Sequence, residues 1–110
     1  MEKMDKQTQE KIQHLQILEQ TLQNLLIQKQ AFQFELSETT SALEEIKNTK
    51  DEVYKLIGQV MIKSSKKEIE KNLEHKKELL NLRINSIDKQ EEKLKKDTES
   101  IRSEVLKHLK

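Results

Sequence analysis

The stretch Asp51-Glu-Val-Tyr-Lys-Leu-Ile-Gly-Gln-Val-Met-Ile-Lys-Ser-Ser65 is the one place in this chain where helical periodicity stops. It holds two short runs of β-branched, aromatic and aliphatic residues, 53–57 and 60–62, separated by Gly58-Gln59. Gly58 is the only glycine of the 110 residues, and it takes the first central position of a two-residue loop, where a type II′ turn needs positive φ. The stretch therefore predicts a β-hairpin with facing pairs Ile57 and Val60, Leu56 and Met61, and Lys55 and Ile62.

Both faces of the predicted hairpin are partly apolar. One face carries Tyr54, Leu56 and Met61, and the other carries Val53, Ile57, Val60 and Ile62. An isolated two-stranded hairpin is marginally stable in water, and two apolar faces make it less so. We therefore expect strands of other chains to join it in a shared sheet or barrel. The alternative is a hydrophobic elbow that links two helices and folds back on their ends.

Composition favours long solvated helices over a compact globule. Hydrophobic residues are 33% of the chain, charged residues 37% and aromatic residues 3%, and proline is absent. The net charge is +1 with the two signs interleaved, so no field that would steer nucleic acid is evident. Cysteine is absent, and we find neither a signal-peptide core nor an apolar run of membrane-spanning length. We expect a cytoplasmic protein without membrane association.

Apolar residues before the hairpin recur in heptads from about residue 5 to residue 47. Eight of the ten a and d positions are apolar; the a positions are Leu15, Leu22, Lys29, Leu36 and Leu43, and the d positions are Leu18, Leu25, Phe32, Thr39 and Ile46. A pattern sustained over five heptads predicts a coiled-coil helix. Asn48 follows as a candidate left-handed cap.

A second helix is predicted from about residue 65 to residue 108. It opens on Ser65-Lys-Lys-Glu68, which has the form of a capping box. Its seam, meaning the inward-facing a and d positions of the heptads, consists of two sets of residues. One set is wholly aliphatic, whereas the companion set is mixed. The aliphatic set is Leu73, Leu80, Ile87, Leu94 and Ile101, and the mixed set is Lys77, Ile84, Glu91, Thr98 and Val105.

Two helices of equal length joined by a short reversing element should pack antiparallel within one chain. The residue numbers in each layer of such a pair have a constant sum, and pairing the aliphatic seam positions, for example Leu22 with Leu94, gives 116. Lys29 then faces Ile87, so its long side chain must leave the seam, and such polar positions most simply specify register. The alternative is an intermolecular parallel coiled coil with splayed helices.

No catalytic, cofactor-binding or metal-binding constellation stands out in the sequence. His14, His75 and His108 each lack a second ligand at helical spacing that would mark a metal site beyond chance. A single glycine leaves no phosphate-cradling loop, so we expect no ATP binding. The basic pairs are diluted by acidic residues and have little aromatic interleaving, which argues against nucleic-acid binding. We expect no enzyme activity.

Apolar residues outside the seam gather toward the two free helix ends. They are Met1, Met4, Ile12 and Ile17 in the first helix, and Leu106 and Leu109 in the second. In an antiparallel pair these ends meet at one tip, where flexible methionine and leucine side chains can adapt to many apolar partners. The alternative is fraying helix ends that retain a few apolar residues.

This layout resembles the β-type subunits of prefoldin, most closely the archaeal ones. The most specific match is Val53-Tyr-Lys-Leu-Ile-Gly-Gln-Val-Met-Ile-Lys63, which looks like the hairpin signature of the family. Leu26-Ile-Gln-Lys-Gln30, Ala42-Leu-Glu-Glu45 and Gln90-Glu-Glu-Lys-Leu94 support it. The resemblance covers nearly the whole chain and implies a single prefoldin-like domain over residues 1–110.

The fold that the resemblance implies is mostly α: a long antiparallel two-helix coiled coil joined by a single β-hairpin that contributes to an intersubunit β-barrel. Further β-type copies and α-type subunits would complete an α2β4 hexamer. The implied oligomerisation residues are Val53, Tyr54, Leu56, Ile57, Gly58, Val60, Met61 and Ile62.

The function that the resemblance implies is an ATP-independent holdase. It would capture unfolded client proteins at the coiled-coil tips and pass them to a cytosolic group II chaperonin. The implied client-binding residues are Met4, Ile12, Leu15, Leu18, Ile101, Val105, Leu106 and Leu109. The alternative is a structural coiled-coil spacer or tether that does not handle unfolded chains.

Overall fold

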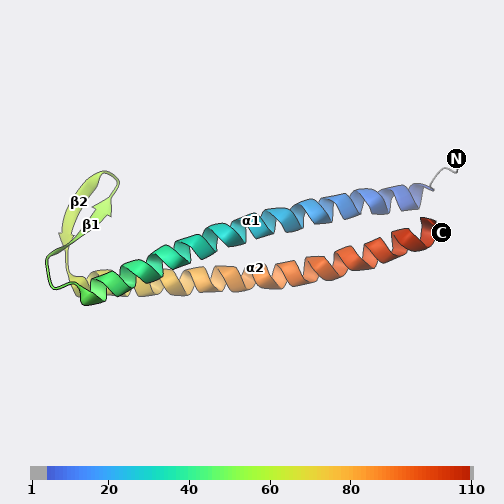
Figure 1. Cartoon of the computed structure of the whole chain (residues 1–110). Coiled ribbons are helices and arrows are strands. Elements are labelled where there is room, and N and C mark those ends of the chain that lie inside the picture. The colour runs from blue at the N-terminus through green and yellow to red at the C-terminus, as the bar shows by residue number, and fades with distance from the viewer. Residues whose placement is uncertain (1–4, 110) are drawn as a thin grey trace. The chain divides into compact units, whose positions relative to one another are not determined.

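The computed structural model describes residues 5–109 as two long helices joined by a two-stranded hairpin. The elements in chain order are α1 (Lys6–Asn48), β1 (Val53–Ile57), β2 (Val60–Ser64) and α2 (Lys66–Leu109). This architecture confirms the predicted fold of two helices and one β-hairpin (Figure 1). No helix in the described range is long and apolar enough to cross a membrane.

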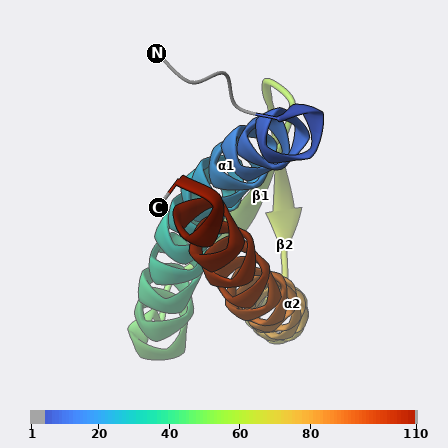
Figure 2. The same ribbon diagram turned by 90° about the vertical axis from the view of Figure 1, so that its right-hand side faces the viewer.

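Contacts divide the chain into two units, each of which contains part of both helices. Residues 1–30 with 85–110 make the free-end unit, and residues 31–84 make the hairpin unit. Within each unit the two helical segments run antiparallel, side by side (Figures 1 and 2). The hairpin unit holds the end of α1, both strands and the start of α2.

Both helices begin at a side chain that caps free backbone amides. The Asp5 carboxylate accepts the backbone N–H of Thr8 at 2.7 Å. Hydrogen bonding with the side chain of Thr8, followed by this backbone bond, lowers the pKa of Asp5. At the start of α2 the Ser65 hydroxyl accepts the backbone N–H of Glu68 at 3.1 Å, as the capping-box pattern predicts. The Glu68 carboxylate accepts the Ser64 hydroxyl at 3.2 Å.

The carboxyl end of α1 is closed without a left-handed residue. Asn48 was predicted as a left-handed cap, and this is wrong, because no described non-glycine residue has positive φ. The backbone N–H of Thr49 instead donates to the Ile46 carbonyl at 3.3 Å, and its hydroxyl donates to the Glu45 carbonyl at 2.7 Å. The Lys66 ammonium donates to the Lys47 carbonyl at 2.9 Å, so the start of α2 helps to satisfy the end of α1.

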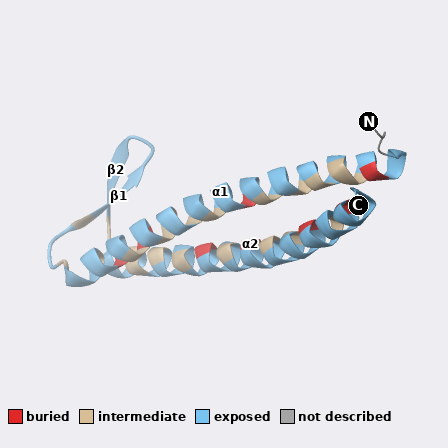
Figure 3. Ribbon diagram, turned by 45° about the vertical axis from the view of Figure 1, so that its right-hand side comes forward, coloured by how far each residue is buried: buried red, intermediate tan, exposed pale blue. Residues whose placement is uncertain are grey.

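A stripe of buried and half-buried side chains runs along the facing sides of α1 and α2 in each unit (Figure 3). All twenty seam positions predicted from the heptads belong to it. The most deeply buried apolar members are Leu25, Leu43, Leu80, Ile87 and Val105. The stripe also extends to Thr8, which lies one heptad before Leu15 and is not among the predicted seam positions.

Contacts across the helices agree with the predicted antiparallel register. In the free-end unit Lys11 pairs with Glu104 at 3.0 Å, and Lys29 pairs with Asp88. In the hairpin unit the Arg83 guanidinium lies 5.6 Å from the centre of the ring of Phe32. The residue numbers of each of these pairs add to within one of the expected 116.

Candidate assembly and client-contact surfaces

The hairpin has the register that its turn sequence predicts. Ile57 pairs with Val60, Leu56 with Met61 and Lys55 with Ile62, and the pairing continues to Val53 and Ser64. Gly58 has a φ of 61°, whereas Gln59 has no positive φ, which is the pattern of a type II′ turn. A type II′ turn matches the right-handed twist of the two strands. Because Gly58 supplies the positive φ that this turn needs, it places the turn at residues 58 and 59 and so sets the register of the strands.

The apolar side chains of both strands are largely uncovered. Val53 is half-buried, and the remaining six retain between 47% and 68% of their accessible surface: Tyr54, Leu56, Ile57, Val60, Met61 and Ile62. Because successive residues point to opposite faces, both faces of the hairpin present this surface. Most of both strands has the colour of exposed residues in Figure 3. A contiguous apolar surface of this kind is typical of an interaction site.

A groove of about 420 Å³ lies where β1 passes the ends of the two helices. The groove belongs wholly to the hairpin unit, and its apolar lining includes Ala42, Ile46, Val53, Leu56, Ile69 and Leu73. It continues the apolar surface of β1 onto the helices. A partner strand that packs on the hairpin would therefore contact apolar side chains of the two helices as well as those of β1.

Glu52 secures the root of the hairpin. Its carboxylate accepts the Lys63 ammonium at 3.1 Å and the Tyr54 hydroxyl at 2.9 Å, so it bridges the first and second strands. The Lys63 bond, with a smaller contribution from Tyr54, lowers the pKa of Glu52. These bonds hold the polar end of the Tyr54 side chain on one face of the ribbon.

The structure separates the predicted client-binding residues into two groups. Ile12, Leu15, Leu18 and Ile101 are half-buried in the seam of the free-end unit, and Val105 is buried there. Leu106 and Leu109 are exposed at 53% and 55%, as is Ile17 at 63% on α1. Met4 lies outside the described residues. Among the described residues, fewer of the predicted client-binding side chains are therefore exposed than the sequence suggests.

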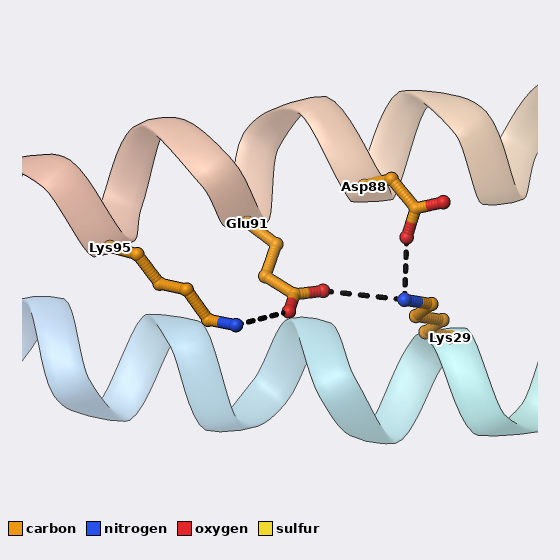
Figure 4. A network of polar contacts seen from close by, with 4 residues as sticks. All are labelled: Lys29, Asp88, Glu91 and Lys95. Carbon is orange, nitrogen blue, oxygen red and sulfur yellow. Dashed lines mark hydrogen bonds and ion pairs between the residues drawn. The ribbon is translucent and has the colours of Figure 1, made fainter.

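A polar cluster interrupts the seam in the free-end unit (Figure 4). The Lys29 ammonium on α1 pairs with the carboxylate of Asp88 on α2 and lies 3.5 Å from that of Glu91. Glu91 also accepts the Lys95 ammonium at 2.8 Å. The heptad pattern predicts Lys29 and Glu91 in the seam but does not point to Asp88, although the antiparallel register sets Asp88 beside Lys29.

The cluster shifts the titration of its members in opposite directions. The bond to Asp88 raises the pKa of Lys29, and Glu91 acts in the same direction. The bond from Lys95, followed by the charge of Lys29, lowers the pKa of Glu91 against the opposing effect of burial. Both charged forms are therefore favoured around neutral pH.

The part of the chain that the structure describes offers no metal centre. No group of three or more His, Cys, Asp or Glu side chains within residues 5–109 could hold a metal ion. The hairpin surface and the exposed side chains near the helix ends are candidate functional sites because of the apolar surface that they expose. Both are suited to contact with other polypeptides.

Comparisons with known proteins match these features to one family. A family model described as prefoldin subunit matches residues 9–110. The chain is 35% identical over 106 residues to the prefoldin subunit beta of Saccharolobus islandicus strain L.S.2.15, covering 94% of this chain and 84% of that protein. It is 37% identical over 97 residues to that of Archaeoglobus fulgidus, covering 86% and 84%.

A solved structure is similar over nearly the whole chain. The crystal structure of the prefoldin beta subunit from Thermococcus strain KS-1 superposes with a TM-score of 0.87 at 32% sequence identity. The match covers 96% of this chain and 94% of that one. The similarity therefore includes the hairpin as well as both helices.

Proposed function

Since the chain belongs to the prefoldin subunit family, as a β-type subunit, we propose that its hairpin joins the hairpins of other prefoldin subunits in one assembly. The observation that carries this proposal is the exposure of apolar side chains on both faces of a two-stranded ribbon. Such a ribbon is marginal alone, and strands from partner subunits would bury both faces. The proposed assembly holds four β-type and two α-type subunits in a hexamer.

The oligomerisation residues in this proposal are those of the ribbon: Val53, Tyr54, Leu56, Ile57, Gly58, Val60, Met61 and Ile62. The apolar groove beside β1 supports it, because it extends the surface that a partner strand would cover. Gly58 contributes through the backbone turn, and the other residues contribute apolar area. About 25 cal/mol is gained for each Å² of apolar surface removed from water, and this gain would offset the entropy cost of bringing several hairpins together.

The prefoldin chaperone subunit is further proposed to hold unfolded clients without ATP, at the free ends of its helices, and to pass them to a cytosolic group II chaperonin. Leu106, Leu109 and Ile17 support client contact, because they expose apolar surface near those ends. Each such arm would bind weakly. Several arms in one assembly would raise the effective concentration, so avidity could exceed single-arm affinity by about 100-fold.

One observation favours the alternative of a coiled-coil spacer. Five of the predicted client-binding residues lie in the helix seam, where they stabilise the pair and offer little surface to a client. A spacer would need the assembly surface of the hairpin but would need no apolar surface at the helix ends. The two functions therefore differ in whether Leu106 and Leu109 contact unfolded clients.

An aggregation assay separates the two functions. The assembled complex should suppress aggregation of a chemically unfolded model protein in the absence of ATP, and Leu106→Ser with Leu109→Ser should weaken this suppression several-fold. Leu82→Ser is the matched control, because Leu82 is also an exposed leucine of α2 at 65% but belongs to the hairpin unit. Suppression that is absent from the unaltered complex, or equal in all variants, would contradict client capture at the free ends.

A further inference from the structure

The α1 seam in the free-end unit could in principle pair with another copy of itself. Leu15, Leu18, Leu22 and Leu25 occupy four successive seam positions, and the next position is Lys29. Leucines at this spacing pair readily in parallel coiled coils, whereas a single polar residue at an a position selects partner and register. Lys29 is thus the one seam residue in this segment that distinguishes one partner helix from another.

Carboxylates of α2 pair with the Lys29 ammonium, whereas a second α1 would place another cation beside it. In the structure the Lys29 ammonium lies between the carboxylates of Asp88 and Glu91, and the other carboxylate oxygen of Glu91 pairs with the Lys95 ammonium (Figure 4). The side chain of Lys29 is 25% exposed and that of Glu91 13% exposed, so neither charge is fully solvated. A parallel α1–α1 pair would instead set Lys29 against Lys29 of the second copy.

The aliphatic seam of α2 does not distinguish registers that differ by one heptad. Leu80, Ile87, Leu94 and Ile101 follow each other at seven-residue spacing, so a shift of about 10.5 Å along the helix replaces one aliphatic residue with another. The polar cluster does distinguish them. A shift in one direction would bring Lys95 and Thr98 to the places of Asp88 and Glu91, and a shift in the other would bring Asn81 and Ile84.

Both alternatives leave charges without partners. The first shift sets Lys95 beside Lys29, and the second sets the uncharged Asn81 and Ile84 beside it. In both registers Lys29 therefore loses the carboxylates of Asp88 and Glu91, while Glu91 keeps only its pair with Lys95 on the same helix. A partly buried charge that loses its partner is destabilising, by less than a fully buried one, whereas the pair itself adds little over an apolar pair of similar size. We infer that the cluster of Lys29, Asp88, Glu91 and Lys95 is a pairing-specificity element, which selects α2 rather than a second α1 as the partner of α1 and fixes a single register.

Introduced thiols test this inference directly, because the chain contains no cysteine. Leu22→Cys alone reports α1–α1 pairing between chains through a short bifunctional thiol cross-linker, and Leu22→Cys with Leu94→Cys reports the pairing of α1 with α2. Each reporter is placed in the unaltered full chain and in the double variant Lys29→Leu with Glu91→Leu. We expect the double variant to raise the interchain yield of the single-thiol reporter several-fold without lowering the midpoint of thermal unfolding.

Two control variants separate specificity from general loosening. Glu19→Gln with Arg102→Gln removes an exposed interhelical ion pair of 2.9 Å in the same unit and should leave both yields unchanged. Lys29→Arg keeps the cation and should retain the low interchain yield. The inference is overturned if the interchain yield of the double variant equals that of the unaltered chain. It is also overturned if that yield rises only together with a lower unfolding midpoint, or rises as much in the Glu19 and Arg102 control.

Discussion

Ile57 and Val60 face each other across the two-residue turn of the hairpin, and both remain more than half exposed, at 55% and 60%. A cross-strand pair of this kind normally gains its stability from apolar neighbours on the same face. Here the other apolar residues of that face, Val53 and Ile62, leave the pair more than half exposed. The pair therefore presents apolar surface that the proposed pairing with other hairpins would cover.

The turn glycine should be needed for its backbone conformation and for no other reason. Gly58 has a φ of 61°, and an added Cβ would meet no atom within 4 Å. Gly58→Ala should therefore destabilise the hairpin by about 1–2 kcal/mol through backbone strain alone. Amide hydrogen exchange in β1 and β2 measures this change. Gln59→Ala is the control, and an equal effect of both substitutions would contradict the type II′ turn.

Leu80 should be the seam residue whose truncation is felt most in the hairpin unit. It is 3% exposed, and Leu80→Ala should lower the free energy of unfolding by about 2–5 kcal/mol, because it removes apolar contacts and leaves a cavity. Circular dichroism during thermal or urea unfolding measures the loss. Leu82→Ala, two residues along the same helix and largely exposed, should change it by no more than about 0.5 kcal/mol. Equal losses would show that the seam is misplaced.

Thr98 should be replaceable with a gain in stability. Its hydroxyl is buried, and among the residues with described positions it finds no hydrogen-bond partner. Thr98→Val keeps the shape and removes the unsatisfied group, so we expect about 1 kcal/mol of added stability in urea unfolding. Thr39 is buried to a similar extent, but its hydroxyl donates to the Glu35 carbonyl at 2.8 Å, so Thr39→Val should gain less. Destabilisation by Thr98→Val would point to a partner for its hydroxyl.

Stability should fall as the solution becomes acidic. The Lys95 bond lowers the pKa of Glu91, and the Lys11 bond lowers that of Glu104, so both carboxylates stabilise the fold above their unfolded pKa values. This stabilisation is lost as the pH falls through the lowered folded values. Urea unfolding between pH 7 and pH 3 should show the decline, and Glu91→Gln should make it shallower. A free energy of unfolding that rises toward low pH would have the wrong sign for these pairs.

The cation of the cluster has the opposite dependence. Asp88 raises the pKa of Lys29, so the stabilisation it provides is complete below the unfolded pKa and is lost as the pH rises through the higher folded value. The cluster is therefore most favourable between the acidic range, where Glu91 is protonated, and the alkaline range, where Lys29 is deprotonated.

The sequence could predict the hairpin register and the helix seam because both follow from local chemistry. One glycine with positive φ sets the pairing of Ile57 with Val60, and heptad spacing sets which side chains face inward. The family resemblance rested on the same stretch. The turn glycine, the heptad pattern and the Ser65 cap therefore all predict the secondary structure that is observed.

Other features could not be predicted, because they depend on how side chains and chain ends settle in three dimensions. Asn48 was a reasonable left-handed cap by residue type, but Lys66, which is distant in sequence, helps to satisfy the end of α1 instead. The pairing of Lys29 with Asp88 depends on the path of a long side chain out of the seam. Similarly, the sequence predicts Ile12 as free surface, whereas the structure has it half-buried because the seam extends to Thr8.

The most direct test of the central claim is the native mass of the chain, alone and after mixing with an α-type prefoldin subunit that carries two hairpins. If the exposed hairpin is an assembly element, mixing should produce a hexamer, and Ile57→Lys, which puts a charge on one face of the ribbon, should prevent it without loss of helix content. A mass that mixing leaves unchanged, with the chain remaining a stable monomer or simple dimer, would contradict the claim and favour a coiled-coil spacer.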